Sequence, residues 1–112
     1  MSEISRAYQT QITGETGQVW VENGVKFDGM INGQLIEVKG DYSSFVNEST
    51  GSFQSWFTGA QDLVDQANRQ LAAANGVQIS WYFMNQGDLD AVGDLFAQKG
   101  VTGINLIYQP LR

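Results

Sequence analysis

The chain contains neither cysteine nor histidine. Disulfide bonds, zinc sites built from thiolate or imidazole, and acid–base schemes that depend on histidine are therefore excluded. No apolar run approaches the length of a membrane span, and the start MSEISRAYQ lacks the basic segment and apolar core of a signal peptide. Any catalysis must therefore use carboxylates, lysine, tyrosine, serine or a bound hard cation.

Basic residues are also few, with six Lys and Arg against twelve Asp and Glu and a net charge of −6. This balance opposes nonspecific binding to nucleic acid, whose affinity depends largely on cationic contacts with phosphate. It remains compatible with a metal-dependent nuclease, because a cation bound between acids reverses the local field. It also suits docking to a basic partner.

The remaining composition is that of a globular domain. Hydrophobic residues make up 42% of the 112 residues and charged residues 16%. This is enough apolar material for one core and is not the balance of a disordered chain. We therefore interpret residues 1–112 as a single domain.

Apolar periodicity and turn residues divide the chain into helices and strands. Ser2 can cap a first helix. Its apolar stripe would comprise Ile4, Ala7, Tyr8 and Ile12. Asn-Gly turns at 23–24 and 32–33 predict a three-stranded antiparallel meander after this helix. We predict helices over Glu3–Thr13, over Trp56–Asn75 and from a cap at Asp88 to Lys99, and strands over Gln18–Val21, Val25–Ile31, Gln34–Lys39, Val77–Met84 and Gly103–Gln109. The order αβββαβαβ predicts an α/β fold with a mixed sheet flanked by helices.

The hairpin over Val25–Lys39 places two acids opposite each other. Asn32-Gly33 suits the positive φ angles of a two-residue type I′ turn. Counting outward from this turn brings Asp28 opposite Glu37. The same register pairs Ile31 with Gln34 and Phe27 with Val38. Directly opposed side chains have Cβ atoms roughly 4.5–5.5 Å apart and like charges there are destabilising, so the two carboxylates need a cation between them.

Lys39 lies on the same face of its strand as Glu37, because side chains alternate along a strand. Two acids and a lysine thus converge on one point. Carboxylate oxygens are preferred ligands of Mg²⁺. A metal held by Asp28 and Glu37 could polarise a phosphodiester, while Lys39 orients the nucleophile or stabilises developing charge. The alternative is a solvent-facing strand whose charges only keep the protein soluble.

Two later segments also have more than one interpretation. Residues 41–55 are polar and punctuated by glycine, but they hold aromatic residues. This loop could be a lid, a face for a partner, or a surface loop that packs its aromatics into the core. Gln66 and Gln70 lie one turn apart at the edge of the apolar stripe of the long helix. They could face water or reach the hairpin.

This arrangement, with Asp28 on the second strand and Glu37-x-Lys39 on the third, resembles the PD-(D/E)XK restriction-endonuclease fold. It is closer still to the restriction-endonuclease-like (Tox-REase) toxin domains of bacterial polymorphic toxins, which include type VI secretion effectors. The segments that carry the resemblance are SEISRAYQTQITG, NGVKFDG, LIEVKG, DQANRQLAAA and GINLIYQP. One departure is Phe27, which stands where many members have proline.

The resemblance implies a set of site residues. Asp28 and Glu37 would be ligands of Mg²⁺ or Mn²⁺, and Lys39 would be the catalytic lysine. An acid on the first helix often joins the site in this superfamily, and Glu3 is the candidate for this third metal ligand. A glutamine on the helix after the motif recurs in several branches, and Gln70 or Gln66 matches that position.

The resemblance also implies a function. The chain would be a metal-dependent endonuclease that hydrolyses phosphodiester bonds of DNA in rival bacteria and is neutralised by a cognate immunity protein. We expect a domain excised from the C-terminus of a larger protein, secreted by a contact-dependent system and active in the cytoplasm of the target cell. The alternatives are an RNA-cleaving toxin of the same fold, or a non-catalytic domain that binds protein through the Tyr42–Trp56 loop.

Overall fold

The computed structural model describes residues 3–14 and 19–112. The predicted cap at Ser2 and the predicted strand start at Gln18 lie outside these ranges. The described residues form the helices α1 (Glu3–Thr13), α2 (Gly59–Ala74) and α3 (Gln86–Lys99) and a short 3₁₀ helix η1 (Ser43–Phe45). The strands are β1 (Trp20–Glu22), β2 (Val25–Phe27), β3 (Gly29–Ile31), β4 (Gln34–Lys39), β5 (Ile79–Phe83) and β6 (Ile104–Tyr108). None of the helices in these ranges is long and apolar enough to cross a membrane.

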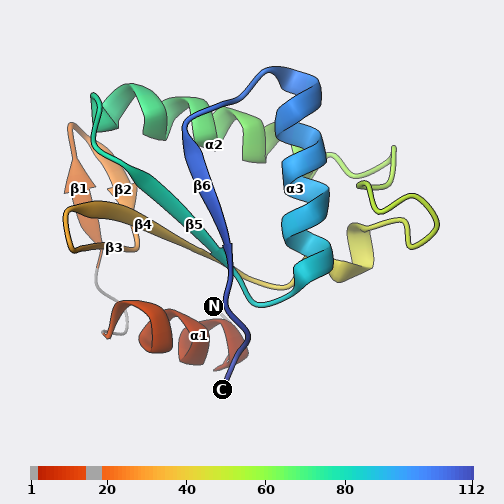
Figure 1. Ribbon diagram of the computed structural model, residues 1–112, viewed down its shortest axis with the longest axis horizontal. Helices are drawn as coiled ribbons and strands as arrows, with labels where there is room; N and C mark the ends of the chain where they lie inside the picture. Colours follow the sequence, from red (N-terminus) through yellow and green to blue (C-terminus); the bar gives the residue numbers. More distant parts are fainter. Residues whose placement is uncertain (1–2, 15–18) are drawn as a thin grey trace.

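The main sheet is mixed, as predicted, and has the strand order β3-β4-β5-β6 (Figure 1). Strands β3 and β4 form an antiparallel hairpin, whereas β4, β5 and β6 are parallel. Parallel neighbours need a crossover connection, and α2 and α3 supply the two crossovers here. Strands β1 and β2 form a separate two-stranded hairpin beside this sheet.

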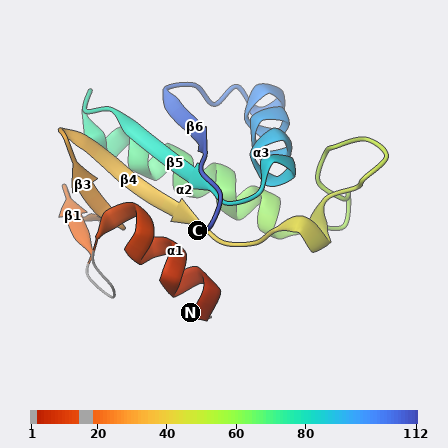
Figure 2. The ribbon, with the colours of Figure 1, turned by 60° about the horizontal axis from the view of Figure 1, so that its bottom comes forward.

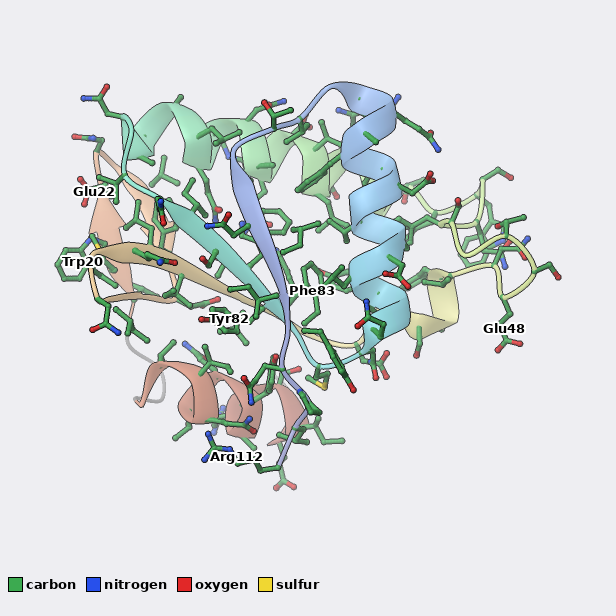
Figure 3. The ribbon with its side chains drawn as sticks, in the orientation of Figure 1. Trp20, Glu22, Glu48, Tyr82, Phe83 and Arg112 are labelled. Atoms are coloured by element: carbon green, nitrogen blue, oxygen red, sulfur yellow. The ribbon has the colours of Figure 1, made fainter. Side chains whose placement is uncertain are left out.

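The helices cover the two faces of the main sheet differently. Figure 2 shows α1 in front of the sheet, with α2 and α3 behind it. Tyr82 and Phe83, which are adjacent on β5, therefore point to opposite sides, Tyr82 towards α1 and Phe83 towards α3 (Figure 3). The main core lies on the α2–α3 side, where Leu35, Trp81 and Phe83 are fully buried. The odd-numbered residues of β4 and β5 face this core.

The predicted strand Val25–Ile31 is interrupted at Asp28, and the prediction of one continuous meander is wrong. The antiparallel pairs of β3 and β4 run from Ile31–Gln34 to Gly29–Ile36. The backbone N–H of Asp28 also donates to Ile36 O, at 2.9 Å. The pairing with β4 ends here, and the residues that precede Asp28 pair with β1 instead. This break in the strand removes the predicted direct pairs Asp28–Glu37 and Phe27–Val38.

Several predicted helix features also differ from the structure. Helix α2 begins at Gly59 and not at Trp56, because the aromatic residues before it pack on one another outside the helix. Helix α3 begins at Gln86, so Asp88 lies in its first turn and does not cap it. On α1 the buried residues are Tyr8 and Gln9, whereas Ile4 is 57% exposed. Tyr8 and Gln9 are thus covered in the structure, whereas Ile4 of the predicted stripe is not.

The loop 41–55 matches the interpretation in which its aromatics pack inward. Tyr42, Phe53 and Phe57 pack against the core. Phe45 stacks on Phe57 with ring centroids 4.3 Å apart. Trp56 is 61% exposed. Most of the aromatic surface of this segment is therefore used to hold the loop on the domain.

The turn that positions β4 is confirmed, since Asn32 and Gly33 both have positive φ angles, of 51° and 78°. Gly33→Ala would force a Cβ into this conformation and should lower the free energy of unfolding by about 1–2 kcal/mol. Gly93→Ala is the matched control, because Gly93 lies within α3 and its added Cβ would lie 3.7 Å from Leu106 Cδ1, an ordinary contact. This control should raise stability by up to about 1 kcal/mol. Urea unfolding measures both, and equal effects would contradict the assignment of the turn.

Candidate active site

Glu37 and Lys39 lie two residues apart on β4 and point into the covered face of the sheet. Their exposed fractions are 9% for Glu37 and 5% for Lys39. Lys39 Nζ lies 3.2 Å from Glu37 Oε2. A buried charge is costly unless it is paired and hydrogen-bonded, so this pair must have further partners.

Two glutamines on α2 supply those partners. Gln66 Nε2 donates to Glu37 Oε2 at 2.9 Å, and Gln70 Nε2 donates to Glu37 Oε1 at 3.2 Å. Lys39 Nζ donates to Gln66 Oε1. Residues four apart on a helix share a face, and so Gln66 and Gln70 can both donate hydrogen bonds to the same carboxylate. Of the two predicted possibilities, the glutamines reach the hairpin and do not face water.

Trp81 on β5 completes the network from the neighbouring strand. Its Nε1 donates to Gln70 Oε1 at 2.7 Å. The Lys39 ammonium lies 4.5 Å from the centre of the Trp81 ring, within range of a cation–π interaction. Trp81 pairs with Glu37 in the parallel register, and so its side chain lies on the same face. The network thus connects β4, α2 and β5.

Asp28 stays near Glu37 although it does not pair with it. Its Oδ2 accepts a hydrogen bond from the backbone N–H of Val38 at 2.7 Å. Burial, followed by repulsion from Glu37, raises the pKa of the Asp28 carboxyl to about 6, while the Val38 hydrogen bond and Lys39 act in the opposite direction. Asp28 also lines a cavity of about 330 Å³ together with Thr13, Val19, Trp20, Gly29, Met30 and Ile31. The Asp28 carboxylate therefore contacts β4 and also borders this cavity.

The predicted participation of Glu3 as a third metal ligand is not seen. Glu3 is exposed at the start of α1. Residues 3–14 and 19–112 contain no group of three acidic side chains that could hold one metal ion. The reason is the placement of α1 on the face of the sheet opposite to α2, whereas Glu37 points towards α2.

The Asp28–Glu37 pair has the donor chemistry of a divalent-metal site. The two carboxylates lie close enough for Glu37 to raise the pKa of Asp28. Each carboxylate oxygen has two lone pairs, so the oxygens bound by the glutamines retain accepting capacity. Mg²⁺ is usually held by one or two protein carboxylates, with water and substrate phosphate completing its coordination. The residues present therefore fit such an ion without a third acid.

The family model for restriction endonuclease fold toxin 5 matches residues 5–86. The chain belongs to this family. Restriction endonuclease fold toxin 5 is a toxin family, and membership with this fold indicates a nuclease toxin whose target is nucleic acid. Its toxin character is consistent with the role of a secreted effector. A search of curated protein sequences found no match.

The toxin-family match spans the residues that build the site. It includes Asp28, Glu37, Lys39 and both glutamines, and it ends at the start of α3. Glu3 lies outside it. The resemblance to restriction-endonuclease-like toxins and the mixed α/β fold are therefore confirmed.

Two aromatic residues near the site are not indicated by the sequence. Trp81 falls at strand spacing among core residues, and only its parallel register with Glu37 brings it to the network. Tyr42 lies near enough to Glu37 that, after burial, this carboxylate helps to raise the pKa of the Tyr42 phenol. No local pattern in the sequence predicts either contact, because both arise from elements distant along the chain.

Gln70 should be more important for stability than Gln66. Gln70 is fully buried, and Gln70→Ala would leave Trp81 Nε1 and Glu37 Oε1 without these partners. We expect a loss of about 2–4 kcal/mol in the free energy of unfolding. Gln66 is only half-buried, so Gln66→Ala should cost about 1 kcal/mol. Urea unfolding of both variants tests this ranking, and equal losses would contradict it.

Asp28 should make the metal-free protein less stable as the pH rises. Its pKa of about 6 in the folded protein exceeds the ordinary 3.8, so protonation favours the folded state. The contribution is complete below about pH 4 and is lost as the pH rises through about 6. Asp28→Asn keeps an acceptor for the Val38 N–H and should abolish the fall in stability that ionisation of Asp28 causes. At pH 8 in EDTA the free energy of unfolding of the variant should exceed that of the parent protein by about 1–2 kcal/mol. The full pKa shift corresponds to roughly 3 kcal/mol, and the expected effect is smaller because Asp28 is partly exposed to solvent. Parallel pH profiles of unfolding for the two proteins would contradict the prediction.

Proposed function

We propose that this domain is a metal-dependent endonuclease that hydrolyses phosphodiester bonds of DNA. The observation that carries the proposal is the buried Glu37–Lys39 pair, held by Gln66 and Gln70 beside Asp28. A domain with only a structural role has no need to keep two mutually repelling carboxylates and a buried lysine at one point. The toxin family with the restriction endonuclease fold supports the same chemistry.

Each side chain has a proposed role in this reaction. Asp28 and Glu37 hold Mg²⁺ or Mn²⁺. When bound, the ion supplies Lewis-acid activation of the phosphate and lowers the pKa of bound water. Lys39 donates hydrogen bonds to the attacking water or to the phosphate oxygens and stabilises the negative charge that develops on them. Gln70 is a positioning residue, because it orients Glu37 and is itself fixed by Trp81.

The biological setting follows from the toxin family and remains part of the proposal. The domain forms the C-terminal part of a larger secreted protein delivered by a contact-dependent system. It acts on DNA in the cytoplasm of a rival bacterium. A cognate immunity protein protects the producing cell, and the net charge of −6 favours a basic partner.

Two other functions are separable by experiment. RNA is the nearest alternative substrate, and parallel digestion of plasmid DNA and total RNA distinguishes the two. A non-catalytic domain that binds protein through the Tyr42–Trp56 loop is less well supported, because Tyr42 and Phe53 are partly buried against the core and Trp56 is the one exposed aromatic residue of this loop. Such a domain would show no metal binding by calorimetry.

The catalytic proposal is tested by substitution of Glu37 and Lys39. Glu37→Gln and Lys39→Met should each lower the rate of plasmid cleavage by roughly 100-fold or more, because each removes a charge placed at the reacting phosphate. EDTA should abolish cleavage by the wild-type protein, and added Mg²⁺ or Mn²⁺ should restore it. Agarose-gel assays of plasmid nicking measure these rates.

Asp65→Asn is the matched control. Asp65 is an exposed acid on α2, next to Gln66 in the chain, and it accepts a hydrogen bond from Gln61. It should leave cleavage unchanged. Circular dichroism must show that the Glu37 and Lys39 variants are folded. Cleavage that persists in EDTA, or in both folded variants, would overturn the proposed function.

A further inference from the structure

A second cavity adjoins the site on the side of α2. Its volume is about 380 Å³. The residues that line it are Gly24, Val25, Lys26, Gln66, Arg69 and Gln70. Gln66 and Gln70 are the side chains that bind the Glu37 carboxylate. The cavity and the proposed catalytic site therefore share a wall.

The other side of this cavity is basic. Lys26 comes from β2 and Arg69 from α2. The two elements are held together by Asn23, whose Nδ2 donates to Ala73 O at 2.6 Å. Within residues 3–14 and 19–112, the Lys39–Glu37 pair is the single ion pair, so neither Lys26 nor Arg69 has a carboxylate partner within 4.0 Å. Both side chains are exposed and free to bind an anion.

Positive charge is concentrated around this cavity, although the chain as a whole is acidic. Lys26, Arg69 and Lys39 make up half of the six basic residues. Lys39 is already bonded to Gln66, which also lines the cavity. No acidic residue lines the cavity. A polyanion that approaches the proposed catalytic carboxylates would thus meet positive charge here.

We propose that this cavity binds the phosphodiester backbone of the nucleic-acid substrate, with Lys26 and Arg69 contacting phosphates adjacent to the one that is cleaved. This inference rests on the proposed nuclease function and assigns a path for the substrate through that site. Lysine and arginine contacts to phosphate supply sequence-independent affinity and position the strand. Arg69 can bind a phosphate through two N–H groups, whereas Lys26 acts as a point charge.

The test compares two double variants with the same change of charge. Lys26→Gln/Arg69→Gln removes both cations of the cavity. Arg6→Gln/Arg112→Gln removes two cations on the α1 side of the sheet, where Figure 3 shows Arg112 beside α1. All four side chains are exposed, so both double variants should unfold at the same urea concentration as the parent protein.

Binding is measured without turnover, in the Glu37→Gln background, by fluorescence anisotropy of a short labelled oligonucleotide over a range of NaCl concentrations. One arm uses DNA and the other uses RNA of the same sequence. For the substrate that binds, Lys26→Gln/Arg69→Gln should weaken binding by roughly 10–100-fold at low salt. The slope of log K against log salt should become shallower by about 2, one for each phosphate that no longer meets a cation. The control should change the slope by less than half as much.

In protein that retains Glu37, the Lys26→Gln/Arg69→Gln variant should raise KM and leave kcat within about threefold. The reason is that these two residues bind substrate and transition state equally, and the reacting groups are intact. Equal slopes for the cavity variant and the control would overturn the proposed path. The two proposals can fail separately. If Glu37→Gln protein still cleaves nucleic acid while Lys26→Gln/Arg69→Gln makes the salt dependence of binding shallower, the proposed catalytic role of Glu37 is wrong and the proposed binding path is supported.

Discussion

The burial of Glu37 is the constraint on which the rest of the site depends. A carboxylate that is 9% exposed needs a cation and hydrogen-bond donors, because burial of an unpaired charge costs several kcal/mol. Lys39 supplies the cation, and Gln66 and Gln70 supply the donors. Gln70 in turn needs an immobile neighbour, and Trp81 provides one from the next strand. The geometry of the proposed catalytic site and the packing of α2 on the sheet therefore depend on the same set of contacts.

The acidic character of the chain and its nuclease fold are compatible for a local reason. The net charge of −6 describes the whole surface, whereas a phosphodiester responds to the field at the point where it binds. A divalent ion between Asp28 and Glu37 would reverse the sign there. Lys26 on β2 and Arg69 on α2 add positive charge in the neighbouring cavity. The remaining acidic surface would favour a basic partner, which is the character proposed above for the immunity protein.

The sequence by itself determined the local parts of this structure. The helix predicted over Glu3–Thr13 has the observed bounds of α1, although Ile4 of its predicted apolar stripe is exposed. Asn32-Gly33 determined the turn, since few other dipeptides accept two positive φ angles. Strand alternation then placed Glu37 and Lys39 on one face. Each of these depends on the φ/ψ preferences or the periodicity of neighbouring residues, which are present in a short stretch of chain.

Tertiary structure alone decided how the separate elements meet. The strand is interrupted at Asp28, and a hydrogen bond from the Val38 backbone holds this acid near Glu37; no turn residue in the sequence predicts the interruption. Trp81 reaches the site through a parallel register that a helical crossover sets. Glu3 is kept from the site because α1 packs on the opposite face. These outcomes depend on which surfaces bury one another across long separations in the sequence, and no local pattern encodes that choice.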